Sequence, residues 1–194
     1  MKTLPNYIVG IGGSAGGLIA YKELLEFLPS NTGMAFVIVT HILPDANSYL
    51  ADILSRCTKM PVIVASTGMP IRANCIYVSL PNADVLIDNY TFKVVSPRTK
   101  ANALVDYLLT SLAEAMGTGA IGVILSGYDG DGTEGCRHIK AKGGVTFAQD
   151  DASAQVNDMP RSAQAAGCVD FVLPPRKISE ELDRIARASR VKAT

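Results

Sequence analysis

Residues 7–17 read Tyr7-Ile-Val-Gly-Ile-Gly-Gly-Ser14-Ala-Gly-Gly17, an apolar run of strand type followed by a turn of small residues. After Ser14 the apolar residues recur at helical spacing from Leu18 to Leu28, until Pro29 ends the pattern. The stretch therefore predicts a strand, a tight turn that carries Ser14, and a helix. Three interpretations of the turn remain open: a dinucleotide-binding loop, a turn that presents a serine nucleophile, or a structural turn whose serine only caps the helix.

The composition is typical of one α/β domain spanning residues 1–194. The chain is 48% hydrophobic with 17 glycines and no tryptophan, and its 18 basic side chains balance 18 acidic ones. This balance predicts no nucleic-acid partner. No apolar stretch reaches the ~18 residues of a membrane span and no signal peptide is visible, so we expect a cytoplasmic protein without membrane insertion. The four cysteines form no CxxC pair, which favours free thiols over zinc or disulfide bonds.

Apolar runs of strand length alternate with helical patterns through the rest of the chain. This alternation predicts a doubly wound, mostly parallel α/β sheet with helices on both faces, a three-layer α/β/α arrangement. Between Cys75 and Val95, short runs separated by Pro81-Asn82 and Asp88-Asn89 predict a small antiparallel hairpin excursion. The remaining strands are expected at residues 34–40, 61–65, 121–125, 145–149 and 169–173.

The side chains that could carry chemistry follow the expected strands. Ser14 follows the first strand, His41 ends the second, and the loop Ser126-Gly-Tyr-Asp-Gly-Asp-Gly132 follows the strand at 121–125. In a parallel sheet such positions meet at one edge, where ligands bind. A serine nucleophile needs a base and a group that orients the base, and His41 with Asp131 can supply them. Asp129 competes with Asp131 for the orienting role, and either aspartate could instead be a turn residue.

Two further side chains fit a catalytic role less well. His138 stands in the middle of an expected helix beside Arg137 and Lys140, where a solvated helix face explains it. Cys136 is embedded in the same helix, and such thiols are usually small core residues. We therefore expect His41 to be the base and a serine to be the nucleophile.

The dinucleotide interpretation fails at the second strand. Gly10-x-Gly12-x-x-Ala15 matches the loose fingerprint of such loops, but Val39-Thr-His41 occupies the place where an acidic residue would bind the ribose. No G-x-x-x-x-G-K-[ST] loop is present either, which argues against an NTPase. The order serine, histidine, aspartate and the lack of a G-x-S-x-G elbow exclude the α/β-hydrolase arrangement.

Four separated motifs occur in the order found in one known family. They are Ile11-Gly-Gly-Ser14-Ala-Gly-Gly17, Val39-Thr-His41-Ile-Leu-Pro44, Val123-Ile-Leu-Ser-Gly-Tyr-Asp-Gly-Asp131-Gly132 and Met159-Pro-Arg161. Together they resemble the catalytic domain of the bacterial chemotaxis protein-glutamate methylesterases, the CheB family, over about residues 7–186. The resemblance implies a serine hydrolase that removes γ-methyl esters from glutamates of methyl-accepting chemotaxis receptors and often deamidates receptor glutamines.

The resemblance also assigns roles to residues of this chain. It implies Ser14, His41 and Asp131 as the catalytic triad. From the helix start after Ser14, we expect backbone N–H groups near Ala15, and around Tyr128, to stabilise the oxyanion. The resemblance implies no cofactor and no metal. The family usually has threonine where this chain has Ala15, and Met-Gly where it has Tyr128-Asp129, so the surroundings of the triad differ.

The implied partners belong to chemosensory signalling. They are the cytoplasmic domains of the methyl-accepting receptors, with a receptor methyltransferase or a receiver domain as a regulatory partner in cis or in trans. Two alternatives from other classes stay open. One is a catalytically silent relative that only binds signalling proteins, and the other is a nucleotide-binding regulator.

Overall fold

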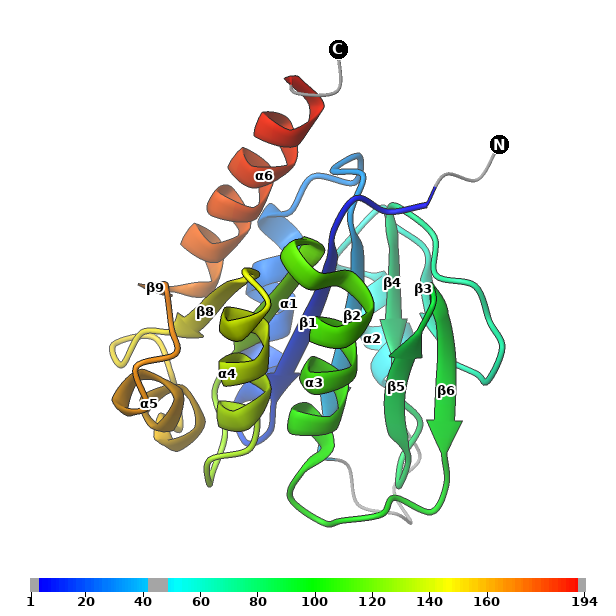
Figure 1. Ribbon diagram of the computed structural model, residues 1–194. Coiled ribbons are helices and arrows are strands. Elements are labelled where there is room, and N and C mark those ends of the chain that lie inside the picture. Colours follow the sequence, from blue (N-terminus) through cyan, green and yellow to red (C-terminus); the bar gives the residue numbers. More distant parts are fainter. Residues whose placement is uncertain (1–3, 42–48, 192–194) are drawn as a thin grey trace.

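The computed structural model describes residues 4–41 and 49–191. Its centre is a seven-stranded sheet in the order β3-β4-β2-β1-β7-β8-β9, in which every neighbouring pair is parallel (Figure 1). The predicted parallel sheet is thus confirmed. Its strands are β1 (Ile8–Gly13), β2 (Ala35–Thr40), β3 (Val62–Val64), β4 (Cys75–Val78), β7 (Ala120–Ile124), β8 (Val145–Gln149) and β9 (Phe171–Leu173).

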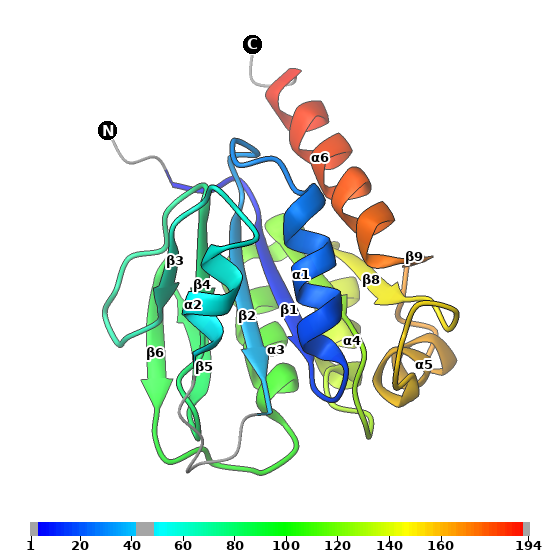
Figure 2. The same cartoon turned by 180° about the vertical axis from the view of Figure 1, so that it is seen from behind.

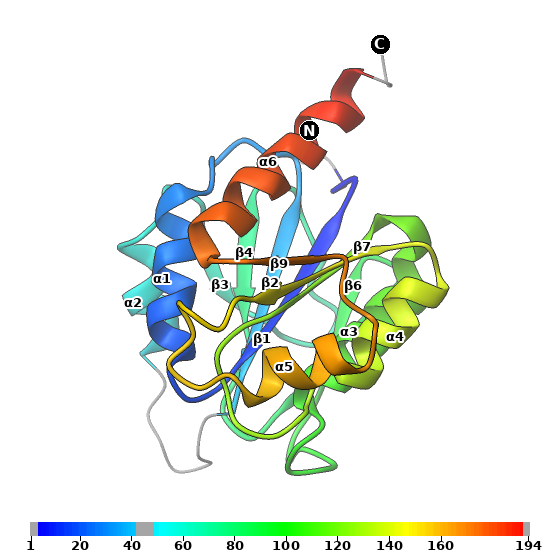
Figure 3. The same cartoon turned by 90° about the vertical axis from the view of Figure 1, so that its left-hand side faces the viewer.

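Helices cover both faces of this sheet. One face carries α1 (Gly17–Phe27), α2 (Leu50–Ser55) and α6 (Pro175–Val191), and the other carries α3 (Leu104–Met116), α4 (Thr133–Ala141) and α5 (Asp158–Ala165). Figure 2 shows the first group in front of the sheet, and Figure 3 shows the sheet between α1 on one side and α3 and α4 on the other. One turn of 3-10 helix, η1 (Gly117–Gly119), follows α3. The predicted three-layer arrangement is confirmed.

Each inner strand contributes to two apolar cores, because successive side chains of a strand point to opposite faces. In β2, Val37 and Val39 share a core with apolar residues of α3, whereas Phe36 and Ile38 share one with α1 and α2. All four side chains are fully buried. Burial on both faces explains why the strands read as continuous apolar runs rather than as alternating patterns.

The segment from Cys75 to Val95 differs in part from the prediction. β4 is not part of the antiparallel excursion, because it pairs in parallel with β2 and β3 in the main sheet. Its residues 76–78 are buried, as expected for an internal strand. The hairpin consists only of β5 (Asp84–Asp88) and β6 (Thr91–Val95), with φ of 45° at Asn89 and 61° at Tyr90 in its turn. Positive φ at both central residues suits the twist of hairpin strands.

The chain reverses its direction of winding around β1. From β1 it proceeds to β2 on one side, and it later returns to β7 on the other side of β1. The connection after β1 leads to α1 on one face of the sheet, and the connection after β7 leads to α4 on the opposite face. In open α/β sheets, ligands bind beyond the strand ends at such a reversal. The turn with Ser14 and the loop with Asp131 both lie here.

Candidate active site

Ser14 occupies the turn between β1 and α1. Its N–H group donates a hydrogen bond to the carbonyl oxygen of Ser126 (2.8 Å), and its own carbonyl oxygen accepts one from the N–H of Gly17 (2.9 Å). Gly16 has a φ of 77°, and a Cβ there would lie 2.6 Å from the hydroxyl oxygen of Ser126. Glycine suits this position because it has no Cβ and tolerates positive φ. The turn therefore holds Ser14 against the end of β7.

The loop after β7 closes onto this turn through Ser126 and Gly127. The Ser126 hydroxyl donates a hydrogen bond to the carbonyl oxygen of Ala15 (2.7 Å) and accepts one from the N–H of Val156 (3.0 Å). A Cβ on Gly127 would lie 3.0 Å from the backbone nitrogen of Ser14 and 2.2 Å from the sulfur of Met159. The sequence did not single out Ser126, because serine in a glycine-rich loop is common in ordinary turns.

His41 follows β2 and lies next to the Ser14 turn. Gly13 of β1 is in register with Thr40 of β2, so Ser14 and His41 leave their strands at the same level. The Nε2 atom of His41 lies 2.8 Å from Oδ2 of Asp131. Because an ionised carboxylate only accepts hydrogen bonds, Nε2 donates its proton in a hydrogen bond to Asp131, and in a neutral imidazole the lone pair is then on Nδ1. Between described residues, no hydrogen bond joins the Ser14 hydroxyl to this imidazole.

The Asp131 carboxylate is buried at the N-terminus of α3. Its Oδ2 accepts a hydrogen bond from the N–H of Val105 (3.0 Å), and its Oδ1 accepts one from the N–H of Asp106 (2.9 Å). Burial alone would raise the pKa of Asp131, but the hydrogen bonds from His41 and from the two helix N–H groups outweigh burial and lower this pKa below its usual value. Asp131 is therefore a stable anion beside His41.

Asp129, the competing acid, has a different place in the structure. Its φ is 65° and it is exposed. Its Oδ1 accepts a hydrogen bond from the N–H of Asp131 (2.8 Å), an arrangement that aspartate often makes in turns. Of the two aspartates, the structure thus pairs Asp131 with the imidazole, and Asp129 shapes the turn that presents it.

The remaining sequence candidates do not join this group. His138 is exposed on α4. Cys136 is fully buried, and a hydrogen bond with Cys168 together with burial raises the pKa of its thiol well above the usual value. A thiol that stays protonated is a poor nucleophile. The last part of the second sequence motif, residues 42–44, lies outside the described residues.

Ala15 and Tyr128 stand on the two loops that meet at Ser14. Ala15 is half-buried, and Tyr128 is 61% exposed. Neither backbone N–H group donates a hydrogen bond to another described residue. Free N–H groups at such places are the type of donor that an oxyanion needs.

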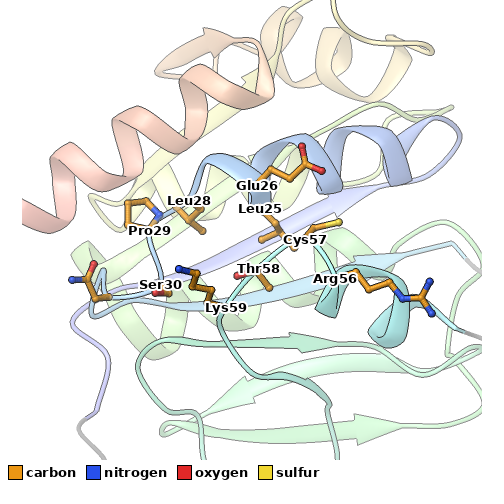
Figure 4. A pocket seen from close by; sticks show the side chains of 10 residues that line it. Leu25, Glu26, Leu28, Pro29, Ser30, Arg56, Cys57, Thr58 and Lys59 are labelled. Carbon is orange, nitrogen blue, oxygen red and sulfur yellow. The ribbon is translucent and has the colours of Figure 1, made fainter.

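A groove of about 600 Å³ is lined by the last turn of α1 and by the segments that follow α1 and α2 (Figure 4). It runs between the C-terminal ends of α1 and α2, with Leu25 and Leu28 on one side and Thr58 and Lys59 on the other. Because α1 runs back from the carboxyl end of β1, its C-terminus lies at the amino end of the strands. The groove is therefore separate from the Ser14 site.

Two kinds of feature are absent from residues 4–41 and 49–191. In these ranges no three or more His, Cys, Asp or Glu side chains are grouped so that they could hold a metal ion. None of the helices described there has the length and apolar character needed to cross a membrane.

Similar proteins share both the sequence and the fold of this chain. The family model for CheB methylesterase matches residues 9–182. A relative from Leptospira interrogans is 34% identical over 178 residues, which cover 90% of this chain and 92% of the relative. The protein-glutamate methylesterase/protein-glutamine glutaminase 1 of Geobacter sulfurreducens is 33% identical over 190 residues, which cover 92% of this chain and 52% of that protein.

A solved structure extends this similarity to three dimensions. The crystal structure of the Thermotoga maritima CheB methylesterase catalytic domain matches with a TM-score of 0.86 and 30% sequence identity. The match covers 94% of this chain and 100% of that chain. By sequence and by fold, the chain belongs to the CheB methylesterase family.

Proposed function

We propose that this chain is a serine hydrolase that removes γ-methyl esters from glutamates of methyl-accepting chemotaxis receptors. The observation that carries the proposal is the 2.8 Å contact between His41 Nε2 and Asp131 Oδ2, at the strand end next to Ser14. Relatives from Geobacter sulfurreducens and Burkholderia orbicola are named protein-glutamate methylesterase/protein-glutamine glutaminase, which supports methyl esters of protein glutamates as the substrate class.

The reaction follows from the roles that the three side chains can take. Nδ1 of His41 accepts the hydroxyl proton of Ser14 as the oxygen attacks the ester carbonyl, and Asp131 stabilises the imidazolium that forms. The N–H groups of Ala15 and Tyr128 stabilise the oxyanion of the tetrahedral intermediate. His41 then returns the proton to the leaving methoxide, which departs as methanol.

Water completes the cycle on the glutamyl ester of Ser14. His41 removes a proton from the water as it attacks, and the serine leaves with that proton, so a free glutamate is released. A glutamine side chain could enter the same sequence, with ammonia as the leaving group in place of methanol. The substrates would be the cytoplasmic domains of receptors, and residues 1–194 would act as one catalytic domain.

The test is methanol release from methylated cytoplasmic fragments of a chemotaxis receptor. The unaltered chain should release methanol, and Ser14→Ala should release none above background because the attacking oxygen is gone. Its melting temperature should stay at the wild-type value, since the Ser14 hydroxyl makes no hydrogen bond to another described residue.

Ser30→Ala is the matched control, because Ser30 is exposed in the groove at the other end of the sheet. It should keep the wild-type rate. Undiminished activity of Ser14→Ala would show that Ser14 is not the nucleophile. Receptor binding by the unaltered chain without methanol release would instead identify a silent binding module.

A further inference from the structure

We propose that Asp106 is a positioning residue that holds Asp131 in place beside His41; this inference rests on the proposed function. It starts from two helices that lack a cap of their own. The residues that precede α3 and α4, Ala103 and Gly132, make no side-chain capping hydrogen bond. The first N–H groups of a helix need acceptors, which must therefore come from elsewhere.

Each of the two helices receives an acceptor from a residue of the other helix or of the loop before it. Asp131, in the loop before α4, accepts hydrogen bonds from the N–H groups of Val105 and Asp106 in the first turn of α3. Asp106, in α3, accepts a hydrogen bond at Oδ1 from the N–H of Gly135 in the first turn of α4 (2.9 Å). The two helices also approach closely here, since a Cβ on Gly135 would lie 2.4 Å from Cβ of Leu109.

Asp106 takes part in both sets of hydrogen bonds. Its N–H holds Oδ1 of Asp131, and its carboxylate holds Gly135, four residues further along the same loop and helix. Residues 131–135 are thus fixed at both ends by one residue of α3. Without the carboxylate, the start of α4 loses this contact with α3, and we expect it to shift and to carry Asp131 away from Nε2 of His41.

The electrostatics indicate that Asp106 contributes through geometry. Burial and the negative charge of Asp131 raise the pKa of Asp106, while the N–H groups of Gly135 and Gly132 oppose this rise and Glu134 adds to it. A carboxylate in this place is therefore electrostatically unfavourable for the folded state. What it supplies is a hydrogen-bond acceptor at the distance that α4 requires.

The first experiment compares turnover in three variants. Asp106→Ala should lower kcat by about 10- to 100-fold with little change in KM, because a displacement of about 1 Å in a catalytic group can cost ~10²-fold. Asp106→Asn keeps an acceptor oxygen and should lose no more than a few-fold. Glu114→Ala is the matched control, because Glu114 of α3 pairs with Lys142, the residue after α4 (2.8 Å), at the end remote from Asp131. It should keep the wild-type kcat.

The second experiment does not require turnover. Ring ¹⁵N shifts of the two histidines, recorded at about pH 9 where an ordinary imidazole is neutral, report which nitrogen carries the proton, and exposed His138 serves as an internal reference. His41 should be protonated at Nε2 in the unaltered chain and in Asp106→Asn. In Asp106→Ala it should become a mixture of both tautomers.

The outcomes separate the two proposals. If the unaltered chain releases no methanol, the proposed function fails, and the tautomer measurement still tests Asp106. A wild-type tautomer in Asp106→Ala, an equal loss of kcat in Glu114→Ala, or an equal loss in Asp106→Asn overturns the positioning role. If Asp106→Ala does not fold, Asp106→Glu takes its place, because it keeps the charge and displaces the acceptor oxygen; it should lose kcat and the single tautomer.

Discussion

The Asp131 carboxylate joins the chemistry of the site to the stability of the fold. One oxygen accepts hydrogen bonds from His41 and Val105, and the other accepts one from Asp106. A carboxylate at a helix N-terminus is stabilised by the helix dipole and by the unpaired N–H groups. The same contacts that fix the position of this anion thus stabilise the start of α3.

Asp131→Asn should therefore lower both activity and stability, with different pH dependence. The turnover number should fall by about 10² to 10⁴-fold, as in other serine hydrolases that lose the orienting carboxylate. The pKa of Asp131 is lowered in the folded state, so its charge adds stability above the ordinary pKa of about 3.9. This contribution disappears as the pH falls through the lowered folded pKa.

Urea unfolding of both proteins between pH 3 and pH 7 measures this difference. The free energy of unfolding of the unaltered chain should exceed that of Asp131→Asn most clearly above about pH 5, and the gap should narrow toward pH 3. A gap that stays constant over the whole range would contradict a stabilising anion at this position. A wild-type turnover number in Asp131→Asn would show that Asp131 has no catalytic role and that only Ser14 and His41 act in the reaction.

At the scale of elements, the site depends on how closely two loops approach each other. The turn after β1 and the loop after β7 are joined by the hydrogen bond from Ser14 to Ser126 and by the bond from the Ser126 hydroxyl to Ala15. The N–H of Gly127 donates to Val156, and the carbonyl oxygen of Gly127 accepts from Met159. Gly127 therefore lies between the β1 turn and α5 with no room for a side chain.

Gly127→Ala should perturb the site and the fold together. The added Cβ would lie 3.0 Å from the Ser14 backbone nitrogen and 2.2 Å from the sulfur of Met159. The Met159 side chain can move, but the Ser14 backbone is held by the β1–β7 contact, so we expect a loss of stability of about 1–3 kcal/mol and at least a tenfold loss of turnover. Thermal unfolding and methanol release measure the two effects.

Gly130→Ala provides the control from the same loop. A Cβ on Gly130 would meet the Ser162 hydroxyl at 3.4 Å, an ordinary contact distance, and Gly130 has no positive φ. This variant should resemble the unaltered chain in stability and turnover. Equal losses in both variants would show that any alanine in the loop is harmful. That result would contradict the explanation by close contacts at Gly127.

The elements were predictable from the sequence where local pattern and tertiary role agree. The apolar runs of β1, β2 and β7 are buried on both faces, so their patterns predicted internal strands correctly. β4 was wrongly placed in the antiparallel excursion, because the turn residues after it have the same appearance in either arrangement. Its pairing with β2 depends on contacts distant in sequence, which a local pattern does not contain.

At the scale of the whole molecule, the reversal of winding at β1 brings the site together. Ser14, His41 and Asp131 are far apart in the sequence, but the order β2-β1-β7 makes their strands neighbours. The position of these residues at strand ends was predictable, because parallel strands share one carboxyl edge. The exchange of acceptors between Asp106 and Asp131 was not, because nothing in the sequence gives the distance between the starts of α3 and α4.

The C-terminal helix α6 also supplies a hydrogen-bond partner to the end of another helix, α1. At the end of α1, the N–H of Leu28 bonds to the carbonyl oxygen of Leu25, so the carbonyl oxygen of Leu24 takes its hydrogen bond from the Ser179 hydroxyl of α6 (2.5 Å). Ser179 is fully buried. Three helix ends are thus satisfied by side chains of other elements, which couples local helix stability to the assembly of the three layers.

Ser179→Ala should therefore destabilise the fold without changing catalysis. A buried carbonyl oxygen that loses its partner costs about 1–3 kcal/mol, while the Ser14 turn lies at the other end of α1 and keeps its contacts. The control is Ser189→Ala, because among the described residues the Ser189 hydroxyl bonds only to the carbonyl oxygen of Ala186 within α6. We expect urea unfolding to show the loss for Ser179→Ala alone, with methanol release by the folded protein unchanged in both variants. A lower turnover number in Ser179→Ala would show that α6 influences the site through α1, and equal stability of the two variants would show that Leu24 finds another donor.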